Sequence, residues 1–184
     1  MKPILFNTEM VKALLDGRKT VTRRVVKPQA KGRPVPMGNN SCWPGYFAIQ
    51  GTENVICPPY HPSDILWVRE TFAQPAAQIF WYRADSPVQA ILWRPSIHMP
   101  REAARIFLRV TGVRAERLKD ITAIQAMDEG FTDWNDFVKL WDSTIKPADR
   151  SRYGWHANPW VWVIEFERIS KEEALKDGKC DKAD

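Results

Sequence analysis

The sequence predicts an α+β protein, built as a small, partly closed β-barrel that helices flank, with a helical insertion in the C-terminal half. Two observations predict this class. Short apolar segments that alternate as strands recur along the 184 residues, and two or three segments with helical spacing lie between them. The chain shows no internal repeat. We therefore expect residues 1–170 to form a single domain and residues 171–184 to form a charged C-terminal tail.

The N-terminal part is expected to contain a strand, a helix and a second strand. Ile4–Phe6 is a short apolar run, and Asn7 or Thr8 can cap the helix that follows, because apolar residues recur there at helical spacing. Gly17 is suited to end that helix, since glycine is common just beyond a helix C-terminus. The next strand is expected around residues 22–26.

The middle of the chain is expected to hold a long loop and several short strands. Residues 27–44 are rich in proline, glycine, lysine and asparagine, which is typical of a loop. The segments expected as strands are 47–49, 65–72, 79–82 and 90–93.

In the C-terminal half, two strands are expected to enclose two helices. Residues 105–118 alternate as a long strand, and residues 160–166 show the clearest strand pattern of the chain. Thr122 and Gln125 form a capping box that opens a short helix. Thr132 is expected to cap a second helix, whose apolar stripe predicts core packing.

Composition favours an anionic partner and argues against several other classes. The formal charge of +5 and the nine tryptophans suit RNA or a nucleotide, since tryptophan also stacks on bases. Cys42, Cys57 and Cys180 lack paired metal-ligand spacing, and their odd number favours reduced thiols in the cytoplasm. The N-terminal apolar run is too short for a signal sequence, and no segment has the roughly 20 apolar residues of a membrane span. We expect no metal, no cofactor and no membrane partner.

Two stretches contain the side chains that are candidates for catalysis or ligand binding. Gly17–Arg24 places an ammonium, two hydroxyls and guanidinium groups directly after the first expected helix, and Asp64–Glu70 ends an apolar strand with a carboxylate. Strand ends and loops beside rigid elements are where sites are commonly built. An amine, an alcohol and an acid brought together can activate a nucleophile, and the same groups in a basic cleft can hold a nucleotide.

These stretches resemble the ASCH family of the PUA-like superfamily. The first family pattern, G-x-K-x-x-T-x-R, is matched at every fixed position by Gly17, Lys19, Thr22 and Arg24. The second, G-D-x-L-W-V-[RK]-E, is matched over residues 64–70, with Ser63 in place of the preferred glycine. A segment over residues 93–106 resembles the longer members that bacteriophages and prophages encode.

The resemblance implies a PUA-like β-barrel flanked by helices, with a cleft whose floor contains both patterns. Many members are expected to bind RNA or a nucleotide, and a small bacterial branch hydrolyses the acetyl amide of N4-acetylcytidine with a lysine, a threonine and a glutamate. Those positions correspond to Lys19, Thr22 and Glu70 in this chain. Other members have been linked to RNA cleavage, and phage members are often labelled morphogenetic.

In the hydrolase interpretation, Thr22 attacks the amide carbonyl and forms an acyl-enzyme that water releases. Lys19 can take the threonine proton only if its pKa falls well below the roughly 10.4 of a free lysine. Arg23 and Arg24 favour that fall, whereas Glu70 opposes it. Glu70 could instead orient Lys19 or accept the proton itself. The alternative without catalysis is a structural ion pair between Lys19 and Glu70.

In the binding interpretation, the same cleft holds a nucleotide. Arg24 and Arg69, with the lysine of the first pattern, would neutralise a phosphate, and Trp81 and Trp93 would stack on bases. His98 lies in a proline-bounded loop, where it could line the rim of the cleft, serve a ribonuclease or bond local backbone.

We therefore expect a cytoplasmic protein that recognises RNA or a modified nucleoside or nucleotide, with amidohydrolase action on an acylated nucleobase as its catalytic form. The alternatives are a non-catalytic RNA-binding module, a phage ribonuclease and an interaction protein in phage assembly. RNA affinity that is sensitive to salt, without any product, would distinguish the binding module from the hydrolase.

Overall fold

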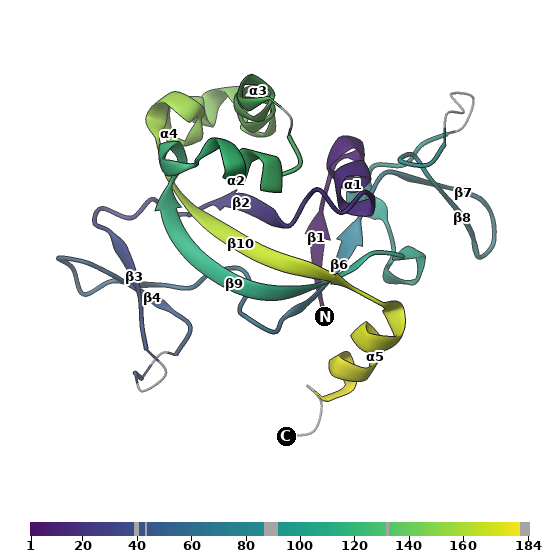
Figure 1. The fold of residues 1–184 in the computed structure, drawn as a ribbon, viewed down its shortest axis with the longest axis horizontal. Coiled ribbons are helices and arrows are strands. Elements are labelled where there is room, and N and C mark those ends of the chain that lie inside the picture. The colour runs from purple at the N-terminus through teal and green to yellow at the C-terminus, as the bar shows by residue number, and fades with distance from the viewer. Residues whose placement is uncertain (39–40, 43, 87–91, 132, 181–184) are drawn as a thin grey trace. The chain divides into compact units, whose positions relative to one another are not determined.

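The computed structural model describes residues 1–38, 41–42, 44–86, 92–131 and 133–180. It shows a mixed α+β protein with several helices and a mixed five-stranded sheet (Figure 1). The α+β class predicted from the sequence is confirmed. The five-stranded sheet is open and does not close into a barrel.

Strands and helices alternate along the chain, as the pattern of short apolar segments predicts. The strands are β1 (Lys2–Leu5), β2 (Val21–Val25), β3 (Pro34–Pro36), β4 (Phe47–Ile49), β5 (Val55–Ile56), β6 (Ile65–Arg69), β7 (Phe72–Ala76), β8 (Ile79–Tyr82), β9 (Phe107–Arg117) and β10 (Trp160–Ile169). The helices are α1 (Thr8–Leu15), α2 (Ala123–Asp128), α3 (Trp134–Thr144), α4 (Arg150–Tyr153) and α5 (Lys171–Cys180).

The strands form three groups among the described residues. The five-stranded sheet has the order β1-β6-β9-β10-β2, a small sheet has the order β3-β4-β5, and β7 and β8 form a hairpin. The chain also divides into two compact units that are not contiguous in sequence. Unit 1 comprises Met1–Thr20, Ser63–Val110 and Phe166–Asp184, and unit 2 comprises Val21–Pro62 and Thr111–Glu165. A single domain over residues 1–170 stays a prediction.

Unit 1 is built on β6, which is buried on both faces, as expected of a strand with a neighbour on each side. β1 pairs with it in parallel and β9 pairs with its other edge antiparallel. Ile65 and Trp67 pack into a core that includes Ala174 of α5. By alternation, Leu66 and Val68 face the opposite side of the sheet.

Unit 2 packs helices against one face of β2 and β10. Val21 of β2 and Val163 of β10 share a core with Phe137 and Trp141 of α3. The two strands pair antiparallel through their whole common length. The apolar stripe of α3 is therefore core, as its helical spacing predicts.

Prolines protect the outer edge of the small sheet. Backbone hydrogen bonds show that Arg33 and Met37 turn their polar backbone groups toward β4. By alternation, Pro34 and Pro36 turn theirs outward, and proline has no N–H to donate. The outer edge of β3 therefore offers no donor to another strand, which is a common protection against edge pairing.

Three predicted segments differ from the observed elements. The expected loop at residues 27–44 contains β3, whose prolines obscure a strand pattern. The expected strand at residues 65–72 is divided between β6 and the start of β7, because Glu70 and Thr71 interrupt it. The expected charged tail is helical over Lys171–Cys180.

Two further predictions fall partly on undescribed positions. Residues 90–91 of the expected strand 90–93 lie outside the described residues, and the following Arg94 forms an isolated bridge with Phe72. Thr132, the expected cap of the second helix, also lies outside the described residues, and Asp133 is the N-cap of α3. The capping box of Thr122 with Gln125 is confirmed at the start of α2.

Candidate functional site

Lys19 follows a helix end whose hydrogen bonds fix the backbone. Gly17 adopts a φ of +74°, and its N–H donates to the carbonyl of Leu14 at 3.2 Å. The N–H of Arg18 donates to the carbonyl of Ala13 at 2.9 Å, which completes the pair of bonds that commonly ends a helix. The N–H of Lys19 reaches the same carbonyl at 3.1 Å. The helix stop predicted at Gly17 is confirmed.

The ammonium of Lys19 lies over an aromatic ring beside Glu70. Its Nζ is 5.5 Å from the centroid of Phe6. The N–H of Phe6 donates to the carbonyl of Arg69 at 3.1 Å, which continues the parallel register of β1 with β6 by one residue. Phe6 and Glu70 are therefore neighbours on one face, and Lys19 lies on the same side of this strand pair.

Arg105 holds the Glu70 carboxylate with both arms of its guanidinium. Its Nε is 2.8 Å from Oε1, and its Nη2 is 2.9 Å from Oε2. Arg105 also forms an ion pair with Asp85, and its Cζ lies 4.0 Å from the centroid of the Tyr82 ring. The hydroxyl of Tyr82 donates to the carbonyl of Ala103 at 2.7 Å. The carboxylate at the end of β6 is thus held in one orientation.

Burial and charge act in opposite directions on this cluster. Burial raises the pKa of the Glu70 carboxyl, the Arg105 guanidinium offsets this only partly, and the negative charge of Asp85 raises the pKa further. Burial lowers the pKa of Arg105, but its hydrogen bonds with the two carboxylates outweigh burial and raise it overall. An interior acid with a raised pKa is a candidate for proton transfer.

The three predicted catalytic side chains are all buried. Lys19, Thr22 and Glu70 are 2%, 0% and 1% exposed, whereas the sequence hypothesis expects a hollow open to solvent. A ligand would reach atoms this deep only after a local opening of the fold. Lys19 and Glu70 belong to unit 1 and Thr22 belongs to unit 2, so their meeting in one hollow stays a prediction.

Thr22 and Arg24 project from the same face of β2, because they are two residues apart. Nη1 of Arg24 donates to Oγ1 of Thr22 at 3.1 Å. Burial lowers the pKa of Arg24, and the charges of Glu129 and Tyr60 act against that shift. A guanidinium in this position would stabilise negative charge that develops on the threonine oxygen.

Arg23 projects from the other face of β2 into an acidic cluster. Its Nη1 is 3.3 Å from Oε1 of Glu129, and its Nη2 is 3.6 Å from Oε2 of Glu116. Nη2 also donates to Oε1 of Gln125 at 3.2 Å. These acids neutralise Arg23, so it does not act as the free cation that the sequence interpretation assigns to it near Lys19.

The predicted stacking residues flank a small residue of the β7–β8 hairpin. Trp81 stands opposite Ala73 in the pairing of β8 with β7. On the other side of β7, Arg94 and Phe72 exchange two backbone hydrogen bonds, at 2.7 and 3.2 Å. This register places Trp93 opposite Ala73 as well. Directly opposed residues share a face, so an indole lies on each side of one methyl group.

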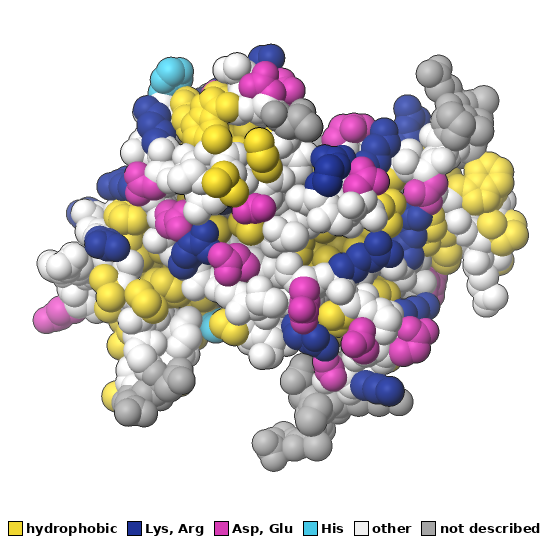
Figure 2. Space-filling view, viewed as in Figure 1, with side chains coloured by type: hydrophobic (Ala, Val, Ile, Leu, Met, Phe, Trp, Pro, Cys, Tyr) yellow, Lys and Arg dark blue, Asp and Glu magenta, His cyan; other side chains and the backbone are white. Residues whose placement is uncertain are grey.

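We refer to Trp81 and Trp93 as the tryptophan pair. Trp81 is 46% exposed, and the hairpin presents hydrophobic surface that is visible in Figure 2. The Cζ of Arg83 lies 5.3 Å from the centroid of Trp93, whose buried indole N–H has no hydrogen-bond partner among the residues described. Strands two apart in a sheet are about 9–10 Å apart. Ala73 between the two indoles is 2% exposed, so a flat ring would enter between them only if the side chains that cover Ala73 move apart.

The other two predicted ligand residues of unit 1 are Arg69, at the end of β6, and His98, in the turn Ser96–His98. Arg69 donates to the carbonyl of Ile97, and its Cζ lies 5.4 Å from the centroid of Trp67. His98 is exposed, and its N–H donates to the carbonyl of Pro95 at 3.0 Å. His98 is thus at the surface, and Arg69 fastens the end of β6 to this turn.

Sequence reasoning named Arg105 only as a candidate for the rim of the cleft, beside His98 and Arg101, and missed the contacts that support this site. Arg105 fixes Glu70, Asp85 shares the guanidinium, and Arg83 contacts Trp93. The one local signal was the segment after the aromatic run of β8, where Arg83 and Asp85 alternate at a strand end. The pairing of Arg105 with Glu70 spans 35 positions and leaves no local pattern.

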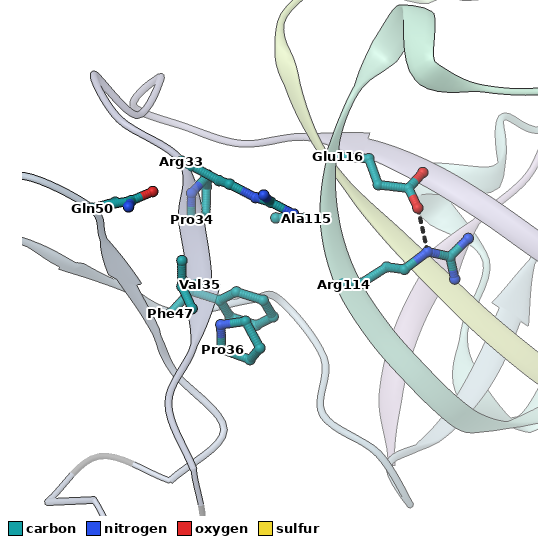
Figure 3. A pocket seen from close by; sticks show the side chains of 9 residues that line it. All are labelled: Arg33, Pro34, Val35, Pro36, Phe47, Gln50, Arg114, Ala115 and Glu116. Carbon is teal, nitrogen blue, oxygen red and sulfur yellow. Dashed lines mark hydrogen bonds and ion pairs between the residues drawn. The ribbon is translucent and has the colours of Figure 1, made fainter.

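Unit 2 contains a hollow of about 570 Å³ at the outer edge of β3. Figure 3 shows the side chain of Arg33 extending toward Ala115 of β9, while Arg114 and Glu116 interact with each other. The guanidinium of Arg33 has no hydrogen bond or ion pair with any part of the chain that the structure describes. The remaining lining residues are Pro34, Val35, Pro36, Phe47 and Gln50. None of the predicted site residues lines this hollow.

Two searches of the described ranges bear on cofactors and membranes. Within these residues, no group of three or more His, Cys, Asp and Glu side chains is arranged to hold a metal ion. No helix in the same ranges combines the length and apolar character needed to cross a bilayer.

Comparison with known proteins gave no match. No protein-family model, curated protein or solved structure matches this chain. The resemblance to the ASCH family therefore depends on the two sequence patterns and on the segment over residues 93–106.

Proposed function

We propose that this chain is an ASCH-type protein with a PUA-like fold that recognises a nucleobase of RNA or a nucleotide through the tryptophan pair. The observation that carries the proposal is the register of the hairpin, which sets Trp81 and Trp93 on either side of Ala73. Stacking on aromatic faces is a common way to hold unpaired bases, because every base has a π-face.

A cation beside the tryptophan pair would neutralise a phosphate. Arg83 has no carboxylate partner among the described residues of the chain. Arg83 also contacts the ring of Trp93. Guanidinium groups beside exposed aromatic rings are typical of single-strand binding surfaces, where the phosphate contacts supply most of the affinity.

The hairpin geometry favours recognition over hydrolysis. Tyr82 alternates with Trp81 and Arg83 along β8, so it faces the opposite side, where its ring contacts Arg105. A base between the two tryptophans would therefore lie across the hairpin from the Arg105–Glu70 pair. The predicted base contacts and the predicted catalytic carboxylate do not share a face.

The test is binding of a fluorescein-labelled single-stranded RNA of mixed sequence, followed by fluorescence anisotropy. Trp81→Ala and Trp93→Ala should each weaken binding by about 5- to 140-fold, since base stacking contributes about 1–3 kcal/mol. Arg83→Ala should also reduce the slope of log K against log salt by about 0.7 for each phosphate that the protein no longer neutralises. Arg152→Ala, the same charge change on α4 of unit 2, is the matched control.

Equal losses in Arg83→Ala and Arg152→Ala would show that only net charge matters, and would reject the tryptophan pair as the site. Unchanged affinity in both tryptophan variants, with native circular dichroism, would reject it as well. Ala73→Leu offers an independent check where its circular dichroism stays native, because Ala73 is 2% exposed and a larger side chain between the indoles should exclude the base without removing either ring.

A second candidate, amidohydrolysis of an acylated nucleobase, is favoured by one observation. Lys19 and Glu70 lie on the same side of the β1–β6 pair, and burial raises the pKa of Glu70. Wild-type protein would then release acetate from N4-acetylcytidine, and Glu70→Gln and Lys19→Met would abolish turnover. Absence of turnover in the wild type removes this candidate and leaves the binding proposal unaffected.

A further inference from the structure

Unit 2 brings a thiol, an imidazole and a phenol together outside the proposed site. The Sγ of Cys57 lies 4.0 Å from Nε2 of His61. The hydroxyl of Tyr46 forms a hydrogen bond with the same cysteine, and the ring centroids of Tyr46 and His61 are 6.2 Å apart. Cys57 is exposed. A nucleophile and a base within hydrogen-bonding reach, with the nucleophile open to solvent, form a reactive arrangement.

The backbone around this cluster restricts its geometry. Three of the five residues that follow Cys57 are prolines, at positions 58, 59 and 62, and proline fixes φ and restricts the residue before it. Gly45 approaches the edge of the imidazole that carries Nε2. Its φ is +79°, and a Cβ at this position would lie only 2.8 Å from Cδ2 of His61 and 3.5 Å from Nε2. A side chain here would meet the ring in its present position, so the close approach favours glycine.

We propose that Cys57 is a nucleophilic thiol that forms mixed disulfides with small-molecule disulfides, and that His61 is its base. Nε2 of His61 takes the thiol proton, and the sulfur attacks one sulfur atom of the disulfide R–S–S–R. The Cys57–S–S–R bond forms as the S–S bond of the reagent breaks. The departing thiolate takes the proton from His61 and leaves as R–SH. The reagent is reduced to one thiol while Cys57 is oxidised, so atoms and electrons balance.

Tyr46 assists by donating to the sulfur. Its hydrogen bond to Cys57 raises the pKa of the phenol, so the hydroxyl keeps its proton and can stabilise a thiolate. One contact favours the protonated thiol instead, because the thiol donates a hydrogen bond to the carbonyl of Pro58 at 3.3 Å. That bond breaks when the proton leaves, and the bond from Tyr46 replaces it with a donor. Cys57 and Tyr46 are the titratable groups seen in contact with the His61 ring.

The chain supplies its own reference thiol. Cys42 is also exposed, so it reports how an accessible thiol of this protein reacts. In the full chain with Cys180→Ser, the rate of modification by Ellman's reagent is measured at each cysteine by peptide mass spectrometry. A free thiol is only a few per cent ionised at pH 7, so a neighbouring base should make Cys57 react on the order of tenfold faster than Cys42. Oxidised glutathione should show the same preference.

Two variants and a measurement at high pH test whether His61 activates Cys57. His61→Gln should bring the rate at Cys57 close to that at Cys42, and Tyr46→Phe should reduce it in part. At about pH 9.5, where thiols ionise without help, the ratio of the two rates should approach one. Equal rates at pH 7, or a preference that survives His61→Gln, would overturn the proposal. So would a ratio that persists at high pH, because exposure alone would then explain it.

Discussion

Each unit buries an arginine–glutamate cluster, and the two clusters differ in how exposed the arginine is. In unit 1 the Glu70 side chain is 2% exposed and the Arg105 side chain is 25% exposed. In unit 2 both partners are interior, since the Arg23 and Glu129 side chains are 1% and 3% exposed and lie 3.3 Å apart. The Nε of Arg23 is buried without a hydrogen-bond partner among the described residues.

The difference separates a structural cluster from one that can respond to its surroundings. Arg23 joins β2 to the residues at the end of α2 and has no surface of its own. Arg105 connects the interior carboxylate of Glu70 to Asp85, whose side chain is 51% exposed. A ligand, a proton or a salt ion can therefore act directly on the guanidinium of the unit 1 cluster. In unit 2 the Arg23–Glu129 pair is enclosed, and access from outside is through Glu116, whose side chain is 22% exposed.

The largest expected effect comes from breaking the cluster of unit 2. Arg23→Met should lower the free energy of unfolding by about 3–5 kcal/mol, because it removes the cation that lies 3.3 Å from the buried Glu129 carboxylate. Urea unfolding followed by tryptophan fluorescence measures the change. The double variant Arg23→Met with Glu129→Leu should recover most of the loss, since an apolar pair can replace a buried ion pair. A loss below about 1 kcal/mol in the single variant would contradict an interior role for Arg23.

Local chemistry explains which parts of this fold were predictable. The helix stop at Gly17 and the capping box of Thr122 with Gln125 each need only a few neighbouring residues, and both are confirmed. The strand at residues 160–166 was visible as alternation within a single segment, and residues 79–82 were visible as a short strand candidate. The α+β class follows from such segments, and it is confirmed in the open sheet.

Long-range contacts explain what was missed. Arg105 lies 35 positions from Glu70, and Arg23 lies 106 positions from Glu129, so neither pair leaves a pattern in the sequence. The strand β3 was hidden because its prolines resemble a loop, although on an outer edge they serve to prevent pairing. Both tryptophans lie opposite Ala73 because β7 forms backbone hydrogen bonds on both of its edges. The pattern of a single segment does not predict such pairing.

A smaller effect is expected from breaking the cluster of unit 1. Arg105→Ala should cost about 2–3 kcal/mol near pH 8, because the Glu70 carboxylate loses two charge-assisted hydrogen bonds. The loss should be smaller near pH 5, since Glu70 already has a raised pKa and can take up a proton once its cation is gone. Urea unfolding at the two pH values measures the difference.

Arg105→Lys is the matched control for this prediction. Lysine keeps the charge but lacks the planar guanidinium that can form two parallel hydrogen bonds. The free energy of unfolding of Arg105→Lys should therefore lie between those of the wild type and Arg105→Ala. Equal losses at both pH values in Arg105→Ala would contradict the view that the interior carboxylate senses its surroundings.

The smallest expected effect concerns the pH dependence of stability, which two glutamate variants should change in opposite directions. Burial raises the pKa of Glu70, so between its ordinary pKa and its folded value the native state binds more protons than the unfolded state. The contribution of Glu70 to the free energy of unfolding therefore falls as pH rises through that window.

Glu173 acts in the opposite direction. Hydrogen bonds with Ser170 at the start of α5 lower the pKa of Glu173, so its contribution to stability is present above its ordinary pKa and is lost as pH falls. Compared with the wild type, Glu70→Gln should make stability rise more steeply with pH, and Glu173→Gln should make it rise less steeply, in thermal unfolding scans between about pH 3 and pH 7. The same direction of change in both variants would mean that the Glu70 carboxylate is stabilised by Arg105 more than it is penalised by burial.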